Sequence, residues 1–182
     1  MSATPSKVER LSFLLGDWRG TGVMTFNRAI SVAVEYEVRR MCKLTPDGSQ
    51  IELVEFSDNP NDERMFHGEH SFIYVDSSSG GLRLRRHSFL DSEDRGFFVT
   101  EEEVEVAGDG TPAILRSADE GGKNPIHQRT VQRVSDSELK AKGKIIMGSR
   151  IDPYEIRLAR RKAKAMLALR KREQTRMLRR NL

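Results

Sequence analysis

The chain has 182 residues, of which 37% are hydrophobic and 32% are charged, and its formal net charge is +4. This length holds one domain with a sizeable core plus an appendage, and no apolar run approaches the roughly 18 residues of a membrane span. The N-terminus lacks the basic start and apolar stretch of a secretory signal, and the single cysteine, Cys42, excludes an internal disulfide. We therefore expect a cytoplasmic protein.

Charge is divided unevenly along the chain. Residues 150–182 contain twelve Lys or Arg and three Asp or Glu, a balance of +9, whereas residues 1–149 have a balance of −5. An acidic body with a basic tail behaves as two electrostatic objects. We expect a folded domain over residues 1–161 and a basic tail over residues 162–182.

A short apolar helical turn ends at Gly16, and predicted strands follow it with turn residues between them. Period-two alternation identifies the strands and is clearest over residues 30–39, where Tyr36 shares one face with four aliphatic residues. The predicted strands cover residues 17–25, 30–39, 50–56, 64–75, 82–90, 95–106, 113–117, 126–134, 138–147 and 153–161.

No helix of crossover length separates these strands, so a parallel sheet is excluded. An open sheet of ten sequential strands would leave two long edges, which closure into a barrel removes. The sequence therefore predicts an all-β fold, a closed antiparallel up-and-down β-barrel of about ten strands with a short N-terminal helix. Residues 162–181 are rich in strong helix formers and basic side chains and lack Gly and Pro, which predicts a basic amphipathic C-terminal helix.

Four stretches of the chain resemble one known group of barrels. They are Leu14-Leu-Gly-Asp-Trp-Arg-Gly-Thr-Gly22, His67-Gly-Glu-His-Ser-Phe-Ile-Tyr74, Leu84-Arg-Arg-His-Ser-Phe89 and residues 128–139. These stretches resemble nitrobindin-like proteins and their lipocalin-like relatives in the calycin superfamily. The resemblance is scattered over residues 10–161 and implies a closed barrel with an interior cavity.

The resemblance also implies that Trp18 plugs one end of the barrel, stacked by Arg160 or Arg161 from the last strand. Two differences between this chain and the family restrict the class of ligand. Haem-binding members place an axial histidine near the end of the barrel, whereas residues 152–161 contain none, so we expect no haem cofactor. Fatty-acid-binding members use an Arg-x-Tyr pair, whereas Tyr154 and Arg157 are three residues apart and lie on opposite faces of a strand.

Five residues are candidate ligand contacts in the barrel lumen: Tyr36, His70, Phe72, Tyr74 and Arg86. His70 shares the more aromatic face of its strand with Phe72 and Tyr74. One basic group, Arg86 or His87, approaches the lumen or its rim whichever face of that strand is inside. The plain alternatives are a satisfied half-buried histidine and basic rows on a solvated outer face.

Other polar patterns are more simply explained by a solvated or structural role. His127, Arg129 and Arg133 form a basic row, and residues 101–103 are three consecutive glutamates; we expect both on solvated surfaces. His67 and His70 point to opposite sides of one strand, so we expect no metal site. Cys42 fits an ordinary buried or half-buried strand thiol better than a nucleophile.

The leading functional prediction is binding, without catalysis, of a small and largely apolar ligand inside the barrel. The first alternative is an interaction or assembly protein whose basic tail binds an anionic surface, such as RNA, the ribosome or lipid, or a partner protein. The second is an isomerase- or hydrolase-type enzyme acting on a hydrophobic substrate in the barrel. The chain contains no Gly-x-Ser-x-Gly elbow and no phosphate-binding loop.

Overall fold

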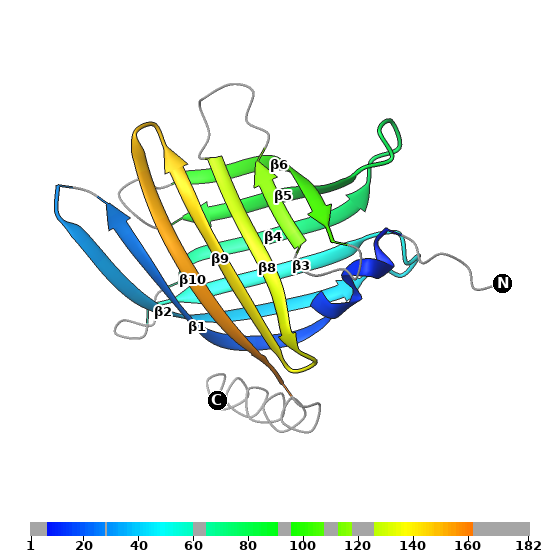
Figure 1. The fold of residues 1–182 in the computed structure, drawn as a ribbon, viewed down its shortest axis with the longest axis horizontal. Helices are drawn as coiled ribbons and strands as arrows, with labels where there is room; N and C mark the ends of the chain where they lie inside the picture. The colour runs from blue at the N-terminus through cyan, green and yellow to red at the C-terminus, as the bar shows by residue number, and fades with distance from the viewer. Residues whose placement is uncertain are drawn as a thin grey trace, which may run out of the picture.

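Ten β-strands and one short 3₁₀ helix make up the part of the chain that the computed structural model describes, which is residues 7–27, 29–59, 65–90, 96–107, 113–117 and 126–161 (Figure 1). The helix is η1 (Glu9–Leu14). The strands are β1 (Gly16–Asn27), β2 (Ser31–Leu44), β3 (Ile51–Asp58), β4 (Met65–Val75), β5 (Leu82–Leu90), β6 (Gly96–Val106), β7 (Ala113–Ser117), β8 (Ile126–Ser135), β9 (Glu138–Met147) and β10 (Arg150–Arg160).

Each strand pairs antiparallel with its neighbours in sequence, and β1 pairs with both β2 and β10, so that the order closes into a barrel. Trp18 of β1 lies opposite Arg40 on one side and Arg160 on the other. The predicted all-β, antiparallel, up-and-down architecture is confirmed. The predicted C-terminal helix and the tail over residues 162–182 lie outside the described residues.

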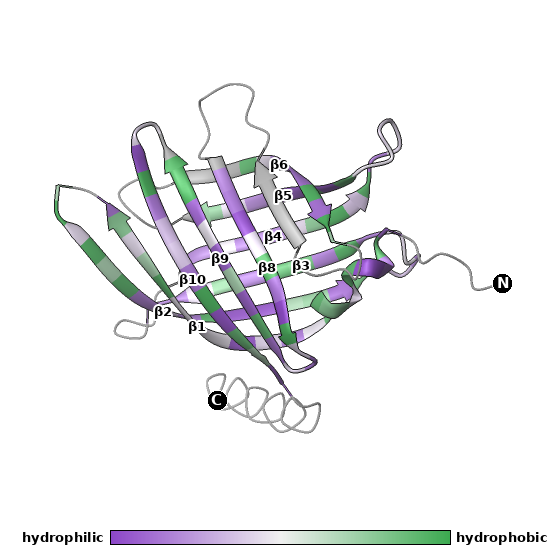
Figure 2. Cartoon of the chain, viewed as in Figure 1, coloured by the Kyte–Doolittle hydropathy of each residue, from purple (hydrophilic) through white to green (hydrophobic). Residues whose placement is uncertain are grey.

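Strand β2 is longer than predicted, because it continues past Arg39 to Leu44. Two consecutive arginines, Arg39 and Arg40, interrupt the apolar alternation and mark an apparent strand end in the sequence. In the structure the alternation continues through them: Arg39 is exposed, Arg40 is buried, and the strand goes on to the buried Cys42. Figure 2 shows the alternation of hydrophilic and hydrophobic residues on other strands, most plainly on β10.

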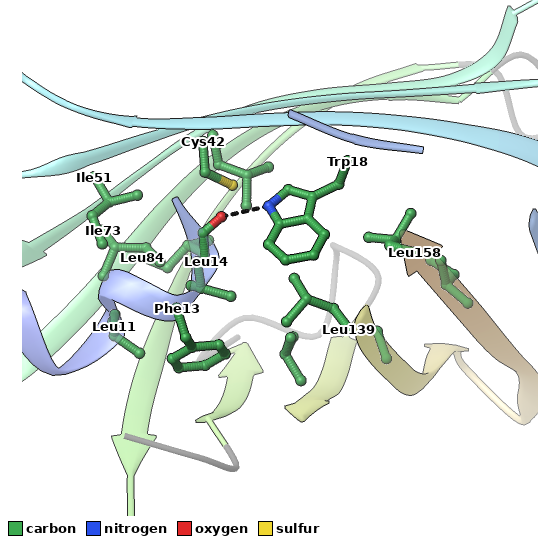
Figure 3. Close-up of a cluster of buried hydrophobic side chains, with 14 of the residues drawn as sticks. Leu11, Phe13, Leu14, Trp18, Cys42, Ile51, Ile73, Leu84, Leu139 and Leu158 are labelled. Carbon is green, nitrogen blue, oxygen red and sulfur yellow. Dashed lines mark hydrogen bonds between the residues drawn. The ribbon is translucent and has the colours of Figure 1, made fainter. Parts of the chain in front are cut away.

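An apolar core fills the end of the barrel that η1 covers. Figure 3 shows Leu14 of η1 beside Trp18 and Leu11 farther along the same cluster; the Trp18 indole Nε1 donates a 2.8 Å hydrogen bond to the Leu14 carbonyl. The Arg160 guanidinium lies 4.7 Å from the centroid of the Trp18 ring and donates to the Leu15 carbonyl, so first and last strands meet under the helix. Arg10 of η1 donates a hydrogen bond to the Val106 carbonyl at the end of β6.

Burial of Cys42 in this core agrees with the predicted strand thiol, and burial raises the pKa of the thiol to about 12. A thiol with this pKa stays protonated and unreactive at neutral pH. No helix in the described part of the chain has the length and apolar character that a membrane crossing requires.

Candidate functional site

The barrel interior changes character beyond the apolar core, where six charged side chains point inward. Three arginines and three glutamates from six different strands are buried there. We call this set the ionic layer: Arg40, Glu55, Glu69, Arg86, Glu102 and Arg129. Burial of this many charges requires that each one be paired.

Ion pairs connect the layer across the barrel. Arg40 Nε donates to Glu55 Oε2 at 2.5 Å, between the neighbouring strands β2 and β3. Arg129 on β8 reaches across to β4, where its Nη2 donates to Glu69 Oε2 at 3.0 Å. Arg86 on β5 bridges two carboxylates, with Nη2 3.0 Å from Glu102 Oε1 and Nε 3.3 Å from Glu69 Oε2.

The carboxylates of the layer differ in their protonation behaviour. Burial alone would raise the pKa of Glu69, but the Arg86 and Arg129 guanidinium groups beside it hold the pKa well below its usual range. The pKa of Glu55 is lowered in the same way, against burial, by Arg40 and Arg129. Glu102 is the exception, because burial raises its pKa more than Arg86 lowers it.

Two tyrosines, Tyr36 and Tyr154, and two histidines, His67 and His127, adjoin the ionic layer. The Tyr154 hydroxyl accepts a 2.9 Å hydrogen bond from Arg129 Nε and lies 2.5 Å from His127 Nε2, whose ring Nδ1 is 3.7 Å from Glu102 Oε1. When His127 Nε2 carries no proton, it can accept the hydroxyl proton of Tyr154. A proton can therefore pass between Tyr154 and His127, whereas the 3.7 Å from His127 to Glu102 is too long for a hydrogen bond.

Both tyrosine rings lie directly against glycines of neighbouring strands. A Cβ atom on Gly22 would lie 2.3 Å from Tyr36 Cζ, and one on Gly143 would lie 2.4 Å from Tyr154 Cζ. Only glycine leaves room for these rings at the barrel wall. The glycines therefore set the position of the two hydroxyl groups beside the ionic layer.

Two guanidinium atoms of the ionic layer retain hydrogen-bonding capacity. Arg40 Nη2 and Arg86 Nε lie at ion-pair distance from carboxylates but have no acceptor in hydrogen-bond geometry among the described residues. A buried donor without an aligned acceptor is costly and rare. An additional acceptor, such as a carboxylate, sulfonate or carbonyl oxygen, would satisfy them.

Of the predicted lumen residues, the structure places Tyr36 and Arg86 in the interior and the other three on the outer face of β4. The side chain of His70 is 50% exposed and its Nε2 lies 2.9 Å from Glu52 Oε1. The ring of Phe72 lies on the same face, 4.8 Å from that of His70, and the Tyr74 hydroxyl donates to Glu101.

The prediction for these three residues is wrong because it assigned the more aromatic face of β4 to the interior. The inward face holds Glu69, Ser71 and Ile73 instead. A buried carboxylate is unfavourable on a single strand, but arginines from β5 and β8 pair with it here. Contacts of this kind between distant segments leave no trace in the alternation pattern of one strand.

Three further interior residues were expected on solvated surfaces. His127 and Arg129 point inward, whereas only Arg133 of that basic row is exposed. Glu102, the middle of three consecutive glutamates, is fully buried. That acidic run did carry a usable signal, because side chains alternate on a strand and one face of β6 had to place a carboxylate inside.

The described residues contain no group of three or more His, Cys, Asp or Glu side chains arranged to hold a metal ion. The inward histidines are His67 on β4 and His127 on β8, and none is on β10. His127 has Tyr154 at one ring nitrogen and Glu102 near the other. These residues do not fit an axially ligated haem on the last strand.

Comparison with solved structures identifies the fold as a calycin-like β-barrel. Rv2717c from M. tuberculosis superposes with a TM-score of 0.61 at 18% identity, over 88% of this chain and 100% of that one. The S-type phycobiliprotein lyase CPES from Guillardia theta superposes with a TM-score of 0.57 at 9% identity, over 87% and 94% of the two chains. At these identities the likeness concerns the fold alone.

A DUF3598-family protein of unknown function from Nostoc punctiforme has a TM-score of 0.55 at 15% identity, and the match spans 88% of this chain but only 54% of that one. No protein-family model and no curated protein matches the sequence.

Proposed function

We propose that the protein binds a small molecule inside its barrel and holds one polar group of that molecule at the ionic layer. The observation that carries the proposal is the burial of three guanidinium groups, two of which keep an N–H without an aligned acceptor. A barrel that served only as a scaffold would be as stable with apolar side chains at these positions. Buried charged groups converging from several strands are typical of ligand sites.

The remainder of the ligand is largely apolar under this proposal. On the side of the ionic layer away from η1, the inward face continues with Met24, which belongs to the core cluster, and with Phe26 and Ile145, which pack against that cluster. Tyr36 lies between these residues and the arginines. A molecule with an apolar body and one acceptor group matches this order. The fold is shared with a phycobiliprotein lyase, so chromophores belong among the ligands to be tested.

Purification from the native host, followed by native mass spectrometry and an absorption spectrum, tests the proposal directly. We expect a defined additional mass, and a rise in Tm with at least one member of a panel of fatty acids, retinoids, planar aromatic acids and tetrapyrroles. Arg86→Gln should lose the rise, whereas Arg85→Gln should keep it, because Arg85 is on the outer face beside Glu101. An empty protein that responds to no member of the panel would contradict the proposal.

The two alternatives remain predictions. Binding of an anionic surface by residues 162–182 concerns residues outside the described structure, and it predicts salt-sensitive binding to RNA or anionic vesicles. Catalysis would rest on Tyr154 and His127, the pair able to transfer a proton in the interior. Turnover of a hydrophobic substrate that Tyr154→Phe abolishes would favour an enzyme.

A further inference from the structure

The ionic layer is electrically balanced before any ligand enters. It contains three guanidinium groups and three carboxylates, which sum to zero when all six are ionised. The neighbouring His67 adds no charge near neutral pH, because burial lowers its pKa. A ligand anion placed at Arg40 and Arg86 would therefore leave one uncompensated negative charge in a water-excluded interior, which is strongly unfavourable.

Glu102 is the carboxylate of the ionic layer with the fewest arginine partners. Glu69 accepts a hydrogen bond from the Ser71 hydroxyl and pairs with two arginines. Glu102 pairs with one arginine, Arg86, whose Nη2 lies 3.0 and 3.1 Å from the two carboxylate oxygens. The other neighbours of Glu102 are Thr100 Oγ1 at 3.4 Å and His127 Nδ1 at 3.7 Å. The charges of Glu69 and Arg129 also act on it and oppose each other. Burial raises the pKa of Glu102, which agrees with this weak support.

Resting on the proposed function, we infer that the site takes up an anionic group together with one proton, which the Glu102 carboxylate accepts while Arg86 transfers its ion pair from Glu102 to the anion. The proton comes from solvent and ends on a Glu102 oxygen. The added negative charge and the added proton cancel, so the interior stays neutral. Glu69, which keeps Arg129, is unchanged. The ligand class is thus an amphiphilic anion whose binding weakens as pH rises.

Two fluorescent probes with the same aromatic body test this inference. 1-Anilinonaphthalene-8-sulfonate carries a sulfonate that stays ionised throughout the pH range, and N-phenyl-1-naphthylamine lacks it. For wild-type protein between pH 6 and 8, we expect the Kd of the sulfonate to rise by up to about tenfold per pH unit, the limit for uptake of one proton. The Kd of the neutral probe should not change. Calorimetry of sulfonate binding in Tris and in phosphate should show net uptake of about one proton.

The adjacent glutamates 101 and 102 provide matched variants on opposite faces of β6. Glu102→Gln imitates the protonated carboxyl, so at pH 8 it should bind the sulfonate about tenfold more tightly than wild type, with little dependence on pH. Glu101→Gln, whose parent carboxylate faces Arg85 and Tyr74 outside, should behave as wild type. Arg86→Gln should lose sulfonate binding, which shows that the probe occupies the barrel.

Three outcomes separate the inference from the proposed function. Binding of both probes that depends on Arg86 but not on pH, with no proton uptake, would overturn the inference and leave the proposed function standing. The same holds if Glu102→Gln folds and does not bind the sulfonate more tightly. If neither probe binds in a manner that depends on Arg86, and no member of the wider ligand panel raises the Tm, both the inference and the proposed function are contradicted. The calorimetric proton count uses wild-type protein and needs no variant to fold.

Discussion

Glu69 is the residue on which the ionic layer depends most, because it pairs with arginines from two other strands. Glu69→Gln would leave Arg86 and Arg129 buried with less compensating charge, and we expect a loss of about 3–5 kcal/mol in the free energy of unfolding. Urea denaturation measures this loss. Glu103→Gln is the matched control, since Glu103 is exposed and its pair with Arg83 should contribute less than about 1 kcal/mol. Equal effects of the two substitutions would show that the layer does not stabilise the fold.

The lowered pKa of Glu69 makes stability depend on pH in a defined direction. The carboxyl binds a proton more weakly in the folded than in the unfolded chain, so its contribution is complete above the unfolded pKa of about 4.5 and is lost as pH falls below it. Denaturation midpoints should therefore decrease between about pH 5 and pH 2 in wild type. The decrease should be smaller in Glu69→Gln, and an identical decrease in both proteins would contradict this assignment.

Gly22 shows how a residue without a side chain sets the position of a neighbouring ring. In Gly22→Ala the new Cβ would collide with the Tyr36 ring, and we expect a cost of about 1–3 kcal/mol in unfolding free energy. Thr21→Ala, at the adjacent exposed position, should change stability by less than about 0.5 kcal/mol. A double-mutant cycle with Tyr36→Leu should recover part of the loss. Strict additivity would show that the collision is not the cause.

At the scale of elements, η1 acts as the apolar closure of one barrel end. Its Leu11 is completely buried against the core, so Leu11→Ala should cost about 2–5 kcal/mol through lost burial and the resulting void. Thermal or urea unfolding measures this cost, with the exposed Ser12→Ala as the control. A small effect of Leu11→Ala would indicate that the barrel end stays closed without the helix.

The positions of the strands in the sequence were largely predictable, whereas the inward faces of β4 and β8 were not. Alternation and turn residues located all ten strands, with errors at the ends such as the early stop at Arg39. Of the five predicted lumen residues, Tyr36 and Arg86 lie in the interior, but His70, Phe72 and Tyr74 do not. An apolar or aromatic face is normally the buried one, and β4 reverses this rule because its inward Glu69 is neutralised from β5 and β8. Pairing between strands far apart in sequence decides such cases, and single-strand periodicity contains no information about it.

At the scale of the whole molecule, the pairing of β1 with β10 has a consequence for biosynthesis. The Arg161 amide donates to the Asp17 carbonyl, so this contact of β1 cannot form until a residue about 140 positions later has been synthesised. Until the ribosome releases the last strand, the hydrogen-bonding edges of β1 and β9 have no partner in the barrel. Contacts at this sequence separation also slow folding. The nascent chain therefore passes through a period in which it is vulnerable to association with other copies, and a chain terminated before Arg150 should accumulate in inclusion bodies rather than as a monomer.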